Sequence, residues 1–199
     1  MWLADYGGYE PARAVTVELT RAYLADEIPA SSLVDVALSV EARRGGMQLY
    51  EQLRDRFEQA GTPGDRQRYI RAMGSFRDPE VVARVLDYVL TGELQPNEVF
   101  TVGSRLAMWP DNNVMLLEWL MEHDSELREM VPAVRMVRFP DMLAVCSPDT
   151  LSTILDFYGA PERAVPGIES ELKDVEAEVM ECWELQQREI GSVSSYLQD

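Results

Sequence analysis

The chain has 199 residues and a formal net charge of −17 at pH 7. This length is enough for one domain with a hydrophobic core or for one small solenoid. So acidic a chain argues against binding to nucleic acid or to an anionic membrane, because both need clustered basic side chains. No apolar run approaches the about 18 residues of a membrane span, and no signal peptide is recognisable. We therefore expect, by default, a cytoplasmic protein.

Apolar residues recur at helical spacing along most of the chain, and no segment alternates with the period of a strand. The first residues lack this pattern, so we predict an irregular linker over residues 1–10 and one α-helical domain over residues 11–199. Ser31 or Ser32 should cap the second helix, and Gly45 and Gly46 should end it. Further along, residues 135–146 read as irregular, and a short turn is expected over residues 192–198. The clearest predicted helices cover residues 11–24, 47–60, 79–90, 96–107, 111–122 and 168–190.

Four prolines stand at nearly even steps in the middle of the chain: Pro63, Pro79, Pro96 and Pro110. Proline suits the first position of a helix, because its missing N–H would be unpaired there and its φ is already helical. The steps leave room for about three helical turns and a short loop. We therefore predict an all-α fold, an antiparallel helical-repeat superhelix of the HEAT or armadillo type, with two helices in each unit of about 32 residues.

Residues that could perform chemistry are scarce. His123 is the one histidine, so a zinc site of the HExxH type cannot form within this chain. Glycine-rich phosphate loops and nucleophile elbows are absent from the sequence. Cys146 and Cys182 each sit among helical apolar residues, and we expect two buried reduced thiols, with a disulfide left open. The chain is expected to hold no cofactor, and whether it belongs to an enzyme is uncertain from these residues alone.

The order of motifs from Arg43 onward resembles a known family. A helix with Tyr50, Leu53 and Phe57 follows a glycine-containing turn, and a block of the form RYI.AM....DP.VV.R.LD covers residues 68–87. The motifs are similar to the helical C-terminal domain of M1-family zinc aminopeptidases, of the endoplasmic-reticulum aminopeptidase and tricorn-interacting-factor type. Weaker matches follow in Leu94-Gln95-Pro96-Asn97, around Trp119, and in Trp183, Val193, Tyr196 and Leu197. The family pattern is not kept at Asn97, Leu117 and Asp124.

The resemblance implies a non-catalytic domain that encloses the active site and contacts the distal part of a peptide substrate. Its implied partners are the protein's own upstream catalytic domain, which would hold the zinc, and the peptide. Met1 would then stand in place of an upstream linker. Arginine binds carboxylates well, so the candidate peptide-binding residues are Arg77, Arg84, Gln95 and Arg105.

Two other hypotheses remain open. The same helices would suit a free-standing helical-repeat scaffold that binds a protein partner, and an all-α enzyme with an unrecognised site is the third possibility. Peptide preference, oligomeric state and the helix faces that line the concave surface are left open by the sequence.

Overall fold

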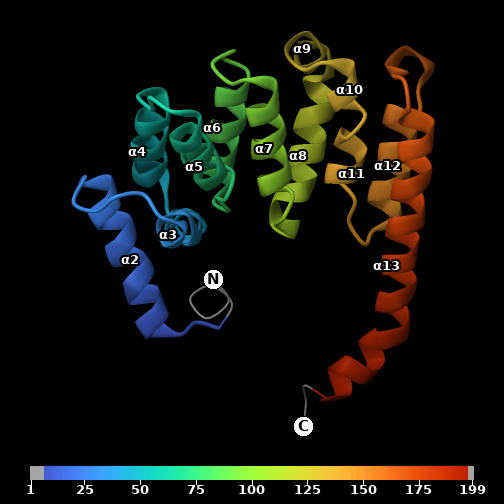
Figure 1. Ribbon diagram of the computed structural model, residues 1–199. Helices are drawn as coiled ribbons and strands as arrows, with labels where there is room; N and C mark the ends of the chain where they lie inside the picture. The colour runs from blue at the N-terminus through green and yellow to red at the C-terminus, as the bar shows by residue number, and fades with distance from the viewer. Residues whose placement is uncertain (1–6, 197–199) are drawn as a thin grey trace. The chain divides into compact units, whose positions relative to one another are not determined.

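The structure is a computed structural model that describes residues 7–196 (Figure 1). Helices, turns and loops make up the described residues, and no β-strand occurs among them, so the predicted all-α fold is confirmed. The chain divides into two compact units, Met1–Leu116 and Leu117–Asp199, and the boundary falls within one helix. The single domain expected over residues 11–199 stays a prediction. Most of the expected linker, residues 1–6, lies outside the described residues.

The first unit is a stack of antiparallel helices in two layers. Helix α5 packs against α3 and α7, while α6 packs against α4, so alternate helices share a layer (Figure 1). Each helix thus packs against the helix two positions further along the chain. This is the helical-repeat arrangement that the proline spacing predicts. The helices of this unit are α2 (Glu10–Leu24), α3 (Ser32–Ala42), α4 (Met47–Glu58), α5 (Pro63–Met73), α6 (Pro79–Val89), α7 (Pro96–Leu106) and the first part of α8 (Pro110–Glu122).

The prolines do begin these helices. Each of α5, α6, α7 and α8 starts at its proline. The Thr62 hydroxyl accepts from the backbone N–H of Asp65, and the Asp78 carboxylate caps α6 in the same way. These side chains satisfy N–H groups that have no partner within the helix, which explains why the helix starts are readable from local sequence.

The core of the first unit fills the space between the layers, and a buried ion pair ties two of its helices together. Arg66 of α5 donates two hydrogen bonds of 2.8 Å to Glu98 of α7, whose side chain is only 5% exposed. Glu98 also accepts from the backbone N–H of Gln95 at 2.8 Å. The largest fully buried side chains of this unit are Phe57, Phe76, Leu38, Leu53, Ile70, Met73, Leu86, Leu106 and Leu116.

The second unit continues from the latter part of α8 and ends in a long helix. Its elements are α9 (Asp124–Met130), α10 (Ala133–Met136), α11 (Phe139–Met142), α12 (Pro148–Tyr158), the 3₁₀ turn η1 (Pro161–Arg163) and α13 (Ile168–Tyr196). Helices α11 and α12 both pack against α13. A small apolar cluster of Leu151, Val175 and Val179 joins α12 to α13.

Three predicted boundaries are wrong. Helix α3 ends at Ala42, and Gly46 is instead the residue that precedes α4 as its N-cap. Residues 135–146 were expected to be irregular, yet α11 and the last two residues of α10 lie there, and Pro140 stands in the first turn of α11. Helix α13 continues through Gly191 to Tyr196, because a single interior glycine costs only about 1 kcal/mol of helix stability. The end of the turn expected over residues 192–198 lies outside the described residues.

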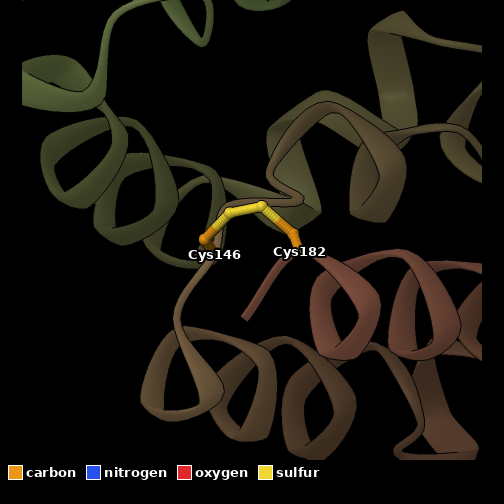
Figure 2. Close-up of a disulfide and its surroundings, with 2 residues drawn as sticks. All are labelled: Cys146 and Cys182. Carbon is orange, nitrogen blue, oxygen red and sulfur yellow. A yellow bond between two sulfur atoms is a disulfide. The ribbon is translucent and has the colours of Figure 1, made fainter. Parts of the chain in front are cut away.

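The expectation of two reduced thiols is also wrong. Cys146, in the loop between α11 and α12, forms a disulfide with Cys182 of α13, and their Cα atoms lie 5.3 Å apart (Figure 2). Both residues are half-buried rather than buried. They are 36 residues apart in sequence, so their proximity depends on how α12 folds back onto α13, which local apolar pattern does not reveal.

A candidate binding site around Trp109

A pocket of about 370 Å³ lies in the first unit, where three chain turns meet. Its walls come from the α3–α4 turn, the α5–α6 loop and the start of α8. Three of its charged residues are arginines in a strongly acidic chain. We call it the arginine pocket, and it is lined by Arg43, Arg44, Gly45, Gly46, Arg77, Asp78 and Asp111.

Two guanidinium groups of the arginine pocket flank one tryptophan. The Arg43 guanidinium carbon lies 4.6 Å from the centroid of the Trp109 ring, and that of Arg77 lies 5.0 Å from it. Trp109 is buried and immediately precedes the first turn of α8. Contacts of this kind hold a flat cation against the aromatic face and restrict its rotation. Arg77 is also ion-paired with Asp111. Its guanidinium group is therefore held by a cation–π contact to Trp109 and by an ion pair to Asp111.

Arg43 is a buried cation in the wall of the arginine pocket. The Arg43 side chain is almost wholly buried, with the residue only 5% exposed. Burial, and then the positive charges of Arg105 and Arg77, lower the pKa of Arg43 to about 10. Arg43 therefore remains a cation at neutral pH, while its surroundings disfavour that charge. A bound anion would offset this unfavourable energy.

Arg105 approaches the same cluster from α7. Its guanidinium donates to Ser75 Oγ at 3.1 Å and to Ser39 Oγ at 3.4 Å. Burial, and next the charge of Arg71, lower the pKa of Arg105 as well. The close approach depends on Gly74, because a Cβ there would lie 2.7 Å from Arg105 Cβ and 3.1 Å from the Val102 carbonyl oxygen. Gly74 thus allows the end of α5 to contact α7.

The four candidate peptide-binding residues do not form one site. Arg77 lines the arginine pocket. Arg105 does not line it, but its positive charge contributes to the lowered pKa of Arg43. Arg84 is largely exposed, pairs with Asp87 at 3.8 Å, and lines a separate pocket between α4 and α6. Gln95 is the N-cap residue of α7, and its backbone N–H bonds to Glu98. Only Arg77 and Arg105 therefore share a neighbourhood.

Arg43 and Trp109 are the site residues that sequence reasoning missed. The sequence signal for Arg43 was its position in Arg43-Arg44-Gly45-Gly46, where a turn brings a basic pair to a helix end. Trp109 is a buried core residue whose ring also positions two arginines, and a single tryptophan before a proline gives no sequence signal for that role.

Metal chemistry has no visible basis in this part of the protein. Among residues 7–196 no group of three His, Cys, Asp or Glu side chains is placed to hold a metal ion. His123 lies at the junction of α8 and α9, where its Nδ1 is 3.4 Å from Glu126 Oε1. None of the described helices combines the length and the apolar character that a membrane span requires.

Comparison with protein families matches residues 1–179 to the family described as the ERAP1-like C-terminal domain. The chain belongs to this family. The resemblance to the C-terminal domain of endoplasmic-reticulum-type M1 aminopeptidases is thereby confirmed. Comparison with curated proteins finds no matching sequence. The family match of this ERAP1-like domain ends at Val179, which is also the last buried residue of α13.

Proposed function

We propose that this ERAP1-like domain encloses the active site of a zinc-dependent M1 aminopeptidase and binds the distal end of its peptide substrate. Peptide binding would place the C-terminal carboxylate of the substrate in the arginine pocket. A bidentate guanidinium–carboxylate contact is the strongest hydrogen-bonded pairing that these residues can offer.

The observation that carries the proposal is the arginine pocket itself. In a chain with a net charge of −17, the guanidinium groups of Arg43 and Arg77 meet at one buried ring. An acidic surface repels most anions, so an anion that reaches this pocket must be attached to a body that binds by other contacts. A peptide satisfies this requirement, since its backbone and side chains can contact the helices around the pocket.

The catalytic steps would belong to an upstream domain of the same protein. That domain would hold the zinc ion, because the described residues of this chain contain no cluster suited to a metal. The zinc would polarise the scissile carbonyl and activate a water molecule. The ERAP1-like domain would contribute substrate positioning and the exclusion of water from the closed site. We expect the source gene to encode an HExxH motif upstream of Met1.

Peptide binding by the 199-residue chain tests the proposal directly. We would measure, by fluorescence anisotropy, the affinity for one labelled decapeptide with a free C-terminal carboxylate and for the same peptide with a C-terminal amide. The carboxylate form should bind about tenfold or more tightly, because a charged hydrogen bond contributes about 1.5–3 kcal/mol. Arg77→Gln should remove most of this difference.

Arg84→Gln is the matched control, since it removes the same charge from the separate pocket between α4 and α6. It should leave the preference for the carboxylate unchanged. Equal affinity for the two peptide forms would overturn the arginine pocket as the carboxylate site. A preference lost in Arg84→Gln and kept in Arg77→Gln would move the site to the α4–α6 pocket.

A further inference from the structure

A second and larger cavity lies elsewhere in the first unit. It has a volume of about 600 Å³, which is within the usual range for small-molecule sites. Helices α2 and α4 form its two sides, and α3 supplies one carboxylate. We call it the α2–α4 cavity. It is lined by Val17, Thr20, Arg21, Leu24, Ala25, Glu41, Leu49, Gln52, Asp55, Arg56 and Gln59.

A buried hydroxyl without a partner lines this cavity. Thr20 is 6% exposed, and its Oγ1 atom makes no hydrogen bond within the described part of the chain. A buried polar group without a partner costs free energy, and such groups are rare in folded proteins. A helical threonine can usually bond to the carbonyl oxygen one turn earlier, which Thr20 does not do. Because Thr20 lines the cavity, a rotation of its side chain would turn this hydroxyl toward a molecule bound there.

Glu41 is the one charged residue of the cavity wall that has no ionic partner among the described residues. Its Oε1 atom accepts a hydrogen bond of 2.6 Å from the hydroxyl of Thr16, which lies 25 positions earlier in the sequence. A carboxylate has about four lone-pair positions, so Glu41 retains the capacity to accept further hydrogen bonds. It is half-buried on the face of α3 that meets the cavity.

The two arginines of the cavity wall are already neutralised by carboxylates. Arg21 donates to both Glu18 and Glu27, at 2.7 to 3.1 Å. Arg56 makes two hydrogen bonds of 2.8 Å to Asp26. Because these guanidinium groups are held by partners of opposite charge, they oppose a cation in the cavity much less than free arginines would.

Apolar side chains complete the cavity. Val17 and Leu24 of α2 and Leu49 of α4 offer aliphatic surface beside the polar groups. The cavity therefore combines a carboxylate, a hydroxyl acceptor and an apolar wall. An ammonium group carries three donors and no acceptor, which matches this set of groups.

We propose that the α2–α4 cavity binds an organic cation, in which an ammonium group meets Glu41 and Thr20 and an aliphatic body lies against Val17, Leu24 and Leu49. The acidic chain would raise the local concentration of such a cation. This site does not depend on the function proposed for the arginine pocket, because the two share no residue and would select ligands of opposite charge.

Calorimetric titration of the intact chain with hexylammonium tests the proposal, with hexanol and hexanoate as probes of the same length. Hexylammonium should bind, and the two other probes should bind at least about tenfold more weakly, because they lack the charged hydrogen bond to Glu41. Glu41→Gln keeps the size of the side chain and an acceptor for Thr16, and should weaken hexylammonium binding by about tenfold. Thr20→Val should weaken it several-fold without destabilising the empty protein.

Glu51→Gln is the matched control, because it removes one negative charge from the exposed face of α4 without altering the cavity wall. Its affinity for hexylammonium should equal that of the parent chain. Equal binding of hexanol and hexylammonium, or an unchanged affinity in Glu41→Gln, would overturn the proposal. So would the absence of any binding at millimolar probe, which would leave water as the partner of Thr20.

A competition arm identifies the source of the ammonium group. An acetylated and amidated tripeptide with a central lysine presents the same chemistry on a polypeptide. Displacement of hexylammonium by this peptide would assign the cavity to a lysine side chain of a peptide. Binding of hexylammonium without such displacement would assign it to a free amine. Both results support the cation site, and neither bears on Arg77.

Discussion

The disulfide between Cys146 and Cys182 leads to the sharpest stability prediction. Replacing both cysteines, in Cys146→Ser with Cys182→Ser, opens a loop of 36 residues that the bond otherwise closes. For a loop of this length, the chain-entropy model gives a stabilisation of about 4 kcal/mol. We expect the variant to lose about that much stability in the second unit, where the bond joins the start of α12 to α13.

Hydrogen exchange resolved by peptide is the appropriate assay, because a chain with two compact units need not unfold in one transition. Amides of α12 and of residues 168–179 in α13 should exchange up to about a thousandfold faster in the double variant, since each 1.4 kcal/mol changes an equilibrium constant tenfold. Amides of α5 and α6 in the first unit provide the internal control and should not change.

The reasoning fails if the unreduced, denatured protein reacts with two equivalents of a thiol reagent, because the bond would then be absent. It also fails if exchange in α12 and α13 is the same in both proteins. The thiol count bears on location too. Disulfides persist mainly in oxidising compartments, so a bonded pair in protein taken from its source would argue against the cytoplasmic expectation.

Four further substitutions, one of them a control, test the first unit. Glu98→Gln should cost about 3 kcal/mol in urea unfolding, because it leaves a partly buried arginine without its counter-ion. Gly74→Ala should destabilise by about 1–3 kcal/mol through its contact with α7. Gly64→Ala should be neutral or stabilising in the same assay, because a Cβ there would meet only Thr62 Oγ1, at an ordinary contact distance of 3.8 Å. The hydrogen bond from Arg56 lowers the pKa of Asp26, so its contribution to stability is present above the unfolded pKa and lost as pH falls below about 4. Asp26→Asn tolerates the positive φ at this position, and its unfolding midpoint should therefore change less than that of the parent chain between pH 5 and about 3.

The sequence predicted the helix starts well and the long-range contacts poorly. Pro63 and Pro79 are correct as first helical residues because the signal and its structural cause lie within four positions. The prediction that α13 ends at Gly191 was wrong, because only the small helix penalty of one glycine disfavours a helix at that position. The pairing of the two cysteines could not be read at all, because it depends on the antiparallel packing of α12 and α13.

The same difference explains the outcome for the candidate site. Arg77 and Arg105 come together because the end of α5 contacts α7 at Gly74, which is a tertiary contact. Arg84 carries the same side chain on a neighbouring helix, yet faces the pocket between α4 and α6. Arginine content alone could not separate these positions. Gln95 illustrates the opposite case, because its place directly before Pro96 already indicates a helix cap.

In this domain, the buried charged side chains are a better guide to the sign of a ligand than the net charge of the chain. A net charge of −17 would suggest that every site on the chain prefers a cationic ligand. At Arg43, however, burial and the positive charges of two neighbouring arginines disfavour the charged form of the side chain. A carboxylate bound there would raise the pKa of Arg43 toward its ordinary value, and its binding would stabilise the folded state. The α2–α4 cavity has the opposite character, since Glu41 faces it without an ionic partner among the described residues. The two proposals thus assign ligands of opposite sign to two sites in one unit, because each site is defined by its own buried groups.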